Sequence, residues 1–236
     1  MNENAIVANI GKETIESTSS VKLLGVTIDN KLNFKQHVTK ICKNISLKLH
    51  ALERISSYID NHKLKLIVKA FIESEFGYCS LIWMFHNRTL NNRINKLHER
   101  ALGLVYKNNT MTFSELLLKD KTFTIHERNL QKLATEMYKI KNNLSPEIVA
   151  NIFVKHNKTY NLRKNKIWEM HNIKTTKYGS ETISFRGPKV WETVPENIKN
   201  SSTILDFKCK IRQWKPECKC RLCKTFIPNL GFIDLQ

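Results

Sequence analysis

The sequence predicts a mainly α-helical protein with a small β contribution, and three observations support this class. Residues 5–10 and 21–29 are short runs rich in β-branched residues, typical of strands. From residue 34 onward, apolar residues recur at spacings of three and four, the period of an amphipathic helix. Hydrophobic residues make up 41% of the 236 residues, which is enough for a core. We therefore expect an N-terminal β-hairpin, a helical bundle, and a mixed α+β C-terminal region with a cysteine-rich tail.

The hairpin is predicted from AIVANI (5–10) and VKLLGVTID (21–29), which we expect to pair with each other across a polar stretch. A two-stranded hairpin is marginal in water unless it packs on a sheet or a helix. We assign residues 1–33 to this unit and expect its natural partner to be missing from this chain.

Three helices are predicted next, over 34–59, 62–76 and 90–106, and they define a helical unit at 34–110. The apolar run 78–85 (YCSLIWMF) is expected to continue their core. The expected inward-facing residues are Phe34, Val38, Ile41, Ile45, Leu49, Leu52, Ile55, Ile59, Leu64, Ile67, Val68, Phe71, Ile72, Leu90, Ile94, Leu97, Ala101, Leu104 and Val105.

The third unit, 111–236, has a less regular pattern. Thr124-Ile-His-Glu127 is a capping-box signal that opens a helix to about residue 142, and Ser145-Pro146 precedes another short helix. Residues 155–189 are predicted as loops and short strands, with YGSETISFRGPKVW (178–191) the strongest extended segment. Ser202 is expected to cap a last helix.

The charge of the chain points to a polyanionic partner. Lys and Arg number 39 against 21 Asp and Glu, a net charge of +18, and the pI is near 9.7. Residues 35–107 hold thirteen basic and five acidic residues, net +8. Nucleic acid is the first expected partner and an anionic membrane the second. No apolar run approaches the ~20 residues that span a bilayer, and we find no secretion signal. We therefore expect an intracellular protein of the nucleus or cytoplasm with no membrane partner.

A catalytic site complete within this chain is not expected. Polymerases and nucleases hold metals with clustered carboxylates, but the five aspartates here lie far apart in the sequence. Glu73 and Glu75 stand two apart on a predicted helix and are expected to be solvated surface acids.

The basic residues are instead predicted to contact phosphates, which Lys and Arg do without reading sequence. The aromatics Tyr78, Trp83 and Phe85 are candidate stacking platforms, although core packing is favoured for them. The predicted nucleic-acid contacts are Lys35, Lys40, Lys43, Lys48, Arg88, Arg93, Lys96 and Arg100, with Arg163, Lys164, Arg221 and Lys224 as secondary ones.

The stretch PECKCRLCK (216–224) has knuckle-like cysteine spacing. Structural zinc takes four Cys or His ligands, and Cys218, Cys220 and Cys223 are candidates, with Cys209 or a distant histidine as the fourth. Reduced cysteines without a metal are an equal alternative, and redox chemistry is a remote third.

Several segments together resemble one family. VKLLGVTIDNKLNFKQHV (21–38), AFIESEFGYCSLIWMFHNRTLNNRINKLHERAL (70–102), YNLRKN (160–165), YGSETISFRGPKVWETVP (178–195) and CRLCK (220–224) occur in the expected order. The chain resembles the C-terminal part of reverse transcriptases from jockey-type non-LTR (LINE-like) retrotransposons, over about residues 5–233.

The resemblance implies a fragment. In the family, fingers and palm precede this region, and the palm carries the catalytic aspartates and their Mg²⁺. Val21–Asp29 would match the hairpin that closes the palm, residues 34–106 the thumb that grips a template–primer duplex, and the rest a region credited with binding element RNA. The implied function is a truncated RNA-directed DNA polymerase without its catalytic centre. The expected partners are RNA and RNA–DNA duplex, and the missing palm and fingers in trans are a further candidate. The alternatives are a host-recruited binding or interaction module and a non-functional relic.

Overall fold

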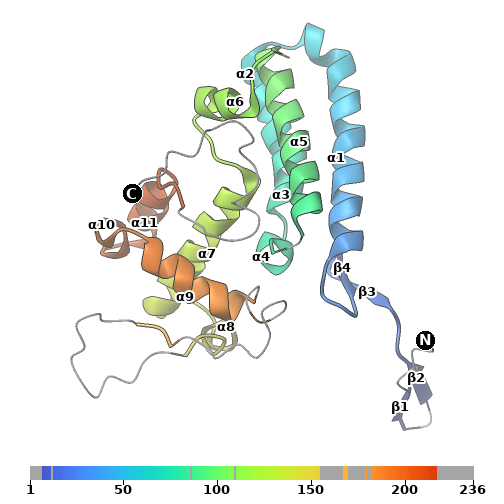
Figure 1. The fold of residues 1–236 in the computed structure, drawn as a ribbon, viewed down its shortest axis with the longest axis vertical. Helices are drawn as coiled ribbons and strands as arrows, with labels where there is room; N and C mark the ends of the chain where they lie inside the picture. The colour runs from blue at the N-terminus through green and yellow to red at the C-terminus, as the bar shows by residue number, and fades with distance from the viewer. Residues whose placement is uncertain are drawn as a thin grey trace, which may run out of the picture.

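The computed structural model describes residues 7–11, 13–85, 87–108, 110–154, 167–169, 179 and 182–216, and these are mostly helical (Figure 1). The strands are β1 (Val7–Ile10), β2 (Glu13–Glu16), β3 (Ser20–Leu23) and β4 (Val26–Asp29). The helices are α1 (Lys35–Ile55), α2 (Asn61–Val68), α3 (Ser74–Gly77), α4 (Ser80–Trp83), α5 (Arg88–Tyr106), α6 (Phe113–Asp120), α7 (Ile125–Lys141), α8 (Glu147–Ala150), α9 (Ile183–Thr193), α10 (Glu196–Lys199) and α11 (Ile204–Ile211). A 3₁₀ turn, η1 (Ser56–Tyr58), follows α1, and a π-helical segment, η2 (Lys69–Glu73), joins α2 to α3.

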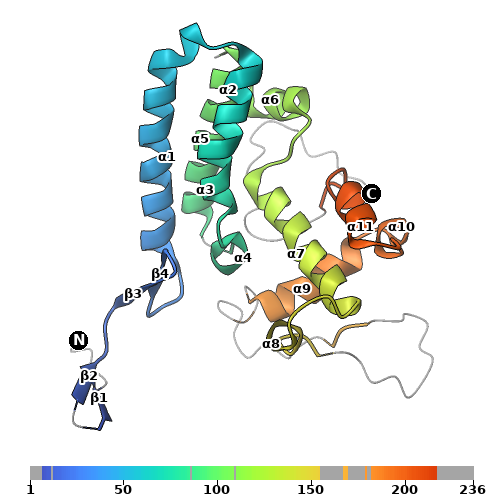
Figure 2. The ribbon, with the colours of Figure 1, turned by 180° about the vertical axis from the view of Figure 1, so that it is seen from behind.

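The strands form two separate antiparallel hairpins, so the predicted pairing of 5–10 with 21–29 is wrong. β1 pairs with β2 and β3 pairs with β4, each across a two-residue connection. In the second hairpin Leu24 and Gly25 both have positive φ, 45° and 85°, as a type I′ turn requires. Each strand therefore has a partner much nearer in sequence than the one predicted. The β1–β2 hairpin lies away from the helices, while β3–β4 lies at the foot of α1 (Figures 1 and 2).

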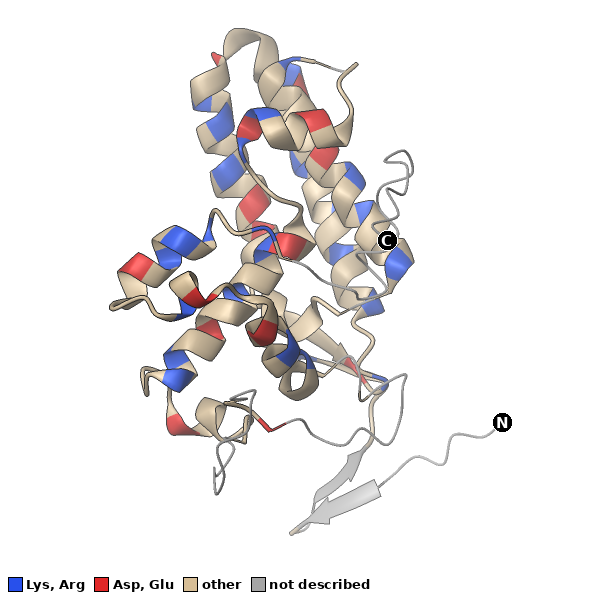
Figure 3. Cartoon of the chain, turned by 60° about the vertical axis from the view of Figure 1, so that its left-hand side comes forward, with Lys and Arg blue, Asp and Glu red and all other residues tan. Residues whose placement is uncertain are grey.

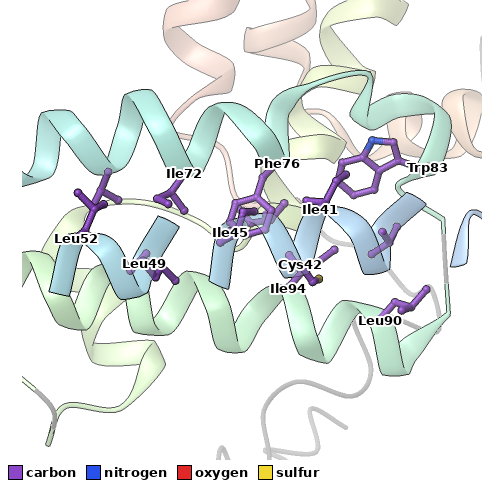
Figure 4. Packing of buried hydrophobic residues seen from close by; sticks show 14 of the residues in the cluster. Ile41, Cys42, Ile45, Leu49, Leu52, Ile72, Phe76, Trp83, Leu90 and Ile94 are labelled. Atoms are coloured by element: carbon purple, nitrogen blue, oxygen red, sulfur yellow. The ribbon is translucent and has the colours of Figure 1, made fainter. Parts of the chain in front are cut away.

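Helices α1, α2–α3 and α5 stand side by side and enclose the first core, which confirms the predicted three-helix arrangement (Figures 1 and 4). Ile45, Leu49 and Ile94 are almost completely buried in it, and Trp83 of α4 closes its lower end. The apolar run 78–85 thus contributes to the core as expected. Of the predicted inward residues, Ile55 is 46% exposed at the end of α1.

The π-helical segment explains a second error, because Phe71 was predicted to face inward and is 58% exposed. The buried residues Leu64, Val68, Ile72 and Phe76 follow one another at intervals of four. In a regular α-helix each such step drifts by about 40° around the axis. The wider π turn removes part of this drift, keeps Ile72 and Phe76 on the core side, and turns Phe71 outward.

The second core lies among α7, α9 and α11 and contains Met137, Tyr138, Trp191 and Phe207. Tyr138 and Trp191 both stack on Phe207, with ring centroids at 4.2 and 6.2 Å. Helix α7 opens with the predicted capping box, in which Thr124 and Glu127 bond each other's backbone N–H groups. Residue Ile125 at the start of α7 belongs to the first core, so this helix is shared by both cores.

The extended segment predicted over 178–191 is contradicted, because residues from Ile183 onward form helix α9. Gly187 and Pro188 favour a turn by local propensity. Both are buried in the helix, and Phe185, Val190 and Trp191 are buried beside them. Tertiary burial therefore overrides the two helix-breaking residues. Helix α11 was predicted correctly, except that its cap is Thr203 rather than Ser202.

Within the described part of the chain, the helices are too short or too polar to cross a bilayer.

Candidate nucleic-acid interface

Helices α1 and α5 carry the eight primary predicted contacts and run in the same direction. Burial raises the pKa of Cys42 on α1, and the charge of Arg93 on α5 opposes this to a smaller extent. Two turns further along α5, Arg100 contacts His50 and Glu53 of α1. Figure 3 shows Lys and Arg spread over many of the helices, with Asp and Glu between them. The question is therefore which cations are free to bind an anion.

Six of the eight predicted contacts are exposed and have no ion-pair partner among the residues that the structure describes. These six free cations, as we call them below, are Lys35, Lys40, Lys43, Arg88, Arg93 and Lys96. Their side chains reach water from the outer surfaces of α1 and α5. They are available to neutralise phosphates without first breaking an ion pair.

Lys48 and Arg100 differ, since each already contacts a carboxylate. Lys48 Nζ lies 2.5 Å from Glu75 Oε1 and also donates to the carbonyl of Phe71 at 3.2 Å. Arg100 donates two hydrogen bonds of 2.6 Å to Glu53, one from Nε and one from Nη2. These bonds lower the pKa of Glu53 and raise the pKa of Arg100. Both cations are thus partly neutralised inside the protein.

The expectation that Glu73 and Glu75 are merely solvated is also wrong. Glu75 is the partner of Lys48, and Glu73 Oε2 accepts a 2.8 Å hydrogen bond from Arg128 Nη2. The Glu73 side chain is only 13% exposed. The two acids therefore tie η2 and α3 to α1 and α7.

The predicted contacts also line two different hollows. Lys40 lines a pocket of about 340 Å³ between the β3–β4 turn, α1 and α3, together with Gly25, His37, Asn44 and Tyr78. Lys96 and Arg100 line a larger pocket of about 620 Å³, which we call the α5–α6 pocket. Its lining residues are Glu53, Ser56, Lys96, Glu99, Arg100, Gly103, Leu104, Lys107, Asn108, Met111 and Leu116.

The β3–β4 hairpin is held to the bundle by polar contacts at its tip and inner edge. The Tyr78 hydroxyl donates to the carbonyl of Leu24 at 2.5 Å, and the Thr27 N–H donates to His37 Nδ1 at 3.3 Å. Because Nδ1 accepts this bond, the ring proton of neutral His37 lies on Nε2. Burial, with a smaller effect of Lys40, lowers the pKa of His37 and favours this neutral form. The contact fixes where the hairpin tip stands relative to Lys40.

Core packing was favoured for the three candidate stacking aromatics. It is confirmed for Trp83 and is wrong for Tyr78. Trp83 is fully buried and donates from Nε1 to the carbonyl of Tyr78 at 2.9 Å. Phe85 is partly buried against the second core. Tyr78 is 52% exposed, so its ring is accessible from the smaller pocket.

Several large aliphatic side chains on and beside the β3–β4 hairpin are open to water. Val21, Leu23, Leu24 and Leu32 are 57%, 58%, 82% and 65% exposed. Val26, the direct cross-strand partner of Leu23, is buried. The four aliphatic side chains are exposed within twelve residues, and we call them the hairpin patch.

The remaining predicted site residues fall mostly outside the described residues. These are Arg163, Lys164, Arg221 and Lys224 for nucleic acid, and Cys218, Cys220 and Cys223 for zinc. Cys209 is described, and its thiol is exposed on α11. In the portion of the chain with described positions, no three His, Cys, Asp or Glu side chains come together as a metal site would need.

Two features of the site went unpredicted. Helix α6, which forms one wall of the α5–α6 pocket, starts with a capping box of Thr112 and Glu115 that the sequence displays as plainly as the one at Thr124. The ion pair between Glu73 and Arg128 joins residues 55 apart, and no local pattern announces it. Comparison of the chain with protein-family models, with curated proteins and with solved structures gives no match in any of the three.

Proposed function

We propose that this chain is the thumb-like and C-terminal, nucleic-acid-binding portion of a non-LTR retrotransposon reverse transcriptase. It binds RNA and RNA–DNA duplex and does not polymerise DNA by itself. The sequence resemblance supports the family, and the excess of positive charge supports a polyanionic partner.

The observation that carries the proposal is the set of free cations on α1 and α5. A phosphate contact contributes most when the cation keeps its full charge and releases condensed counterions from the nucleic acid. Lys35, Lys43 and Arg93 meet this condition, whereas Lys48 and Arg100 have carboxylate partners. Binding of this kind depends on the phosphate backbone and little on base sequence.

The test is the salt dependence of binding to a labelled RNA hairpin and to an RNA–DNA duplex. Each phosphate contact adds about 0.9 to the slope of log K against log salt for a duplex and about 0.7 for single strands. We expect Lys43→Gln to lower the magnitude of the slope by about 0.7–0.9, the contribution of one phosphate contact. The matched control is Lys63→Gln, which removes an exposed lysine already paired with Asp60 at 3.1 Å. Affinity unchanged between about 50 and 200 mM salt contradicts the proposal.

Primer extension tests the enzymatic part. The chain has no clustered aspartates in its sequence, so we expect no nucleotide incorporation with an RNA template, primer, deoxynucleotides and Mg²⁺. Incorporation by the purified chain, absent from a mock preparation, contradicts this part of the proposal.

A structural zinc at Cys218, Cys220 and Cys223 is a further part of the proposal, with Cys209 as the fourth ligand. The exposed thiol of Cys209 stands near the end of α11, seven residues before the end of the described chain. Thiolates in this number are the donor set that zinc prefers. Protein purified under reducing conditions should contain about one equivalent of zinc, and less than about half an equivalent counts against the site.

A second candidate function, a module that works only with a partner, is favoured by the hairpin patch. Exposed apolar clusters of this kind commonly mark interaction sites. Within the proposed family the partner is the palm and fingers portion supplied in trans. A palm–fingers fragment of a related element should gain primer-extension activity when this chain is added, and Leu24→Asp should remove the gain. Equal activity with the variant excludes the patch as the contact.

A further inference from the structure

The α5–α6 pocket shares Lys96 with the free cations, and the other five free cations lie outside it. It lies where the C-terminal ends of α1 and α5 meet α6, at the end of the bundle remote from the hairpins (Figure 1). Its volume of about 620 Å³ lies within the range of small-molecule sites. The residues around it differ in character between the rim and the floor.

The rim offers hydrogen-bond donors of the kind that hold a phosphate. Lys96 Nζ has no partner among the described residues, and it stands one helical turn from Arg100 on α5. The two bonds from Arg100 to Glu53 use Nε and Nη2, so the donors of Nη1 stay unused in the described structure. The bidentate pair also holds the guanidinium plane in a fixed orientation. A phosphate between Lys96 and Arg100 would receive donors from both.

The floor is apolar. Gly103 and Leu116 are buried there, and Leu104 and Met111 are partly buried. A Cβ at Gly103 would stand 3.3 Å from the carbonyl oxygen of Asn108, so glycine allows the close approach of the chain that follows α5. A flat, weakly polar ring could lie on this floor beside the thioether of Met111.

Two carboxylates line the pocket, Glu53 and Glu99. Glu53 is occupied by Arg100, whereas Glu99 has no ion-pair partner among the described residues. A carboxylate repels a phosphate but accepts hydrogen bonds from hydroxyl groups, such as those of ribose. The three groups thus match the three parts of a ribonucleotide: phosphate at the rim, ribose at Glu99, and base on the floor.

We propose that the α5–α6 pocket binds a single unpaired ribonucleotide within RNA. The inference rests on the proposed function, because it names the form of RNA that this end of the bundle selects. A base that is stacked in a duplex cannot reach the floor, whereas a bulged or looped-out base can be splayed into it. The pocket therefore adds selectivity for RNA structure to binding that otherwise depends on charge.

The test compares two RNA hairpins of equal length and charge, one fully paired and one with a single-nucleotide bulge. Their affinities for the full chain are measured by fluorescence anisotropy at one salt concentration. We expect the bulged RNA to bind about five- to twentyfold more tightly, the lower part of the range for one stacked base. Lys96→Gln should lose most of this preference. The matched control Lys69→Gln, an exposed lysine of η2 outside the pocket, should retain it.

Met111→Ser gives an independent variant, because it removes apolar floor without changing charge. It should reduce the bulge preference and leave the affinity for the paired hairpin unchanged. Circular dichroism of each variant reports whether it is folded, and a folded variant that retains the full preference overturns the proposal. Equal affinity of the unaltered chain for both RNAs overturns it as well.

The outcomes separate this inference from the proposed function. Absence of binding to either hairpin contradicts the proposed function, whereas tight binding without discrimination contradicts only the pocket. A direct titration with uridine monophosphate distinguishes a free nucleotide from one held within RNA. We expect no binding tighter than the millimolar range, and micromolar binding would overturn the assignment to RNA.

Discussion

Gly187 in helix α9 allows a test of whether helix propensity or packing controls this part of the protein. In an exposed helix interior, replacing glycine by alanine stabilises the folded state by about 1 kcal/mol. At Gly187, however, an added Cβ would lie 2.6 Å from Phe153 Cε1 and 2.9 Å from Met137 Sδ. Both separations are shorter than van der Waals contact, so the neighbours must move to accept the methyl group.

The neighbours have little room to move. Phe153 is 6% exposed and packs edge-on against Trp168, with ring centroids 6.1 Å apart, and Met137 is fully buried. Overpacking a core of this kind costs about 1–3 kcal/mol. We place the cost in the upper part of that range, because two contacts are violated. After subtraction of the propensity gain, Gly187→Ala should destabilise the protein by about 1–2 kcal/mol.

The assay is urea denaturation followed by circular dichroism, together with a thermal melt. The loss corresponds to a decrease in Tm of roughly 2–8 °C for a chain of this size. Gly77→Ala is the matched control, because its nearest neighbour is the flexible Lys132 Nζ at 3.4 Å, and we expect no loss there. Phe153→Leu should reduce the cost of Gly187→Ala in the double variant. An unchanged or higher urea midpoint for Gly187→Ala would refute the packing argument.

Three other predictions concern polar groups. Asp29 accepts the N–H groups of residues 31, 33 and 34, so Asp29→Ala should cost about 1–2 kcal/mol and accelerate hydrogen exchange over residues 31–37. Burial lowers the pKa of His98 from 6.5 to about 3, so the unfolded chain takes up the proton first and stability falls as the pH drops below 6.5. His98→Leu should therefore remove about 2 kcal/mol of the stability difference between pH 6.5 and pH 5 in urea titrations. Asp120→Asn weakens a 2.5 Å ion pair with Lys65 at a buried carboxylate and should lower the free energy of unfolding by about 1–3 kcal/mol, measured by urea denaturation. Asp206→Asn, at an exposed pair, should change it little.

The helices of the first core could be predicted because their apolar residues repeat with a local period. The same is true of α7, whose capping box is complete within four residues. The exposure of Phe71 could not be predicted, because one π turn changes which residues face the core and leaves no clear mark in the sequence pattern.

Strand pairing and the surroundings of individual side chains could not be predicted from the sequence. Strand β3 found its partner across Leu24 and Gly25, and nothing in residues 5–10 excluded the longer pairing that we predicted. Gly187 and Pro188 are compatible with a turn or with a buried helix, and the residues that pack around them determine which of the two forms. Likewise, the charge of Arg100 is evident in the sequence, but its carboxylate partner lies 47 residues away. The free cations could thus be separated from the paired ones only after the fold was known.

Helix α7 sets a fixed spacing between the two halves of the protein. It has 17 residues and is therefore about 25 Å long. Its first turn contacts the first core through Ile125, and its residues from Leu130 to Ile140 contribute to the second core. The helix therefore holds its two ends about 25 Å apart, and an RNA that contacts both ends must span this distance. Binding should weaken for RNAs that are too short to span it.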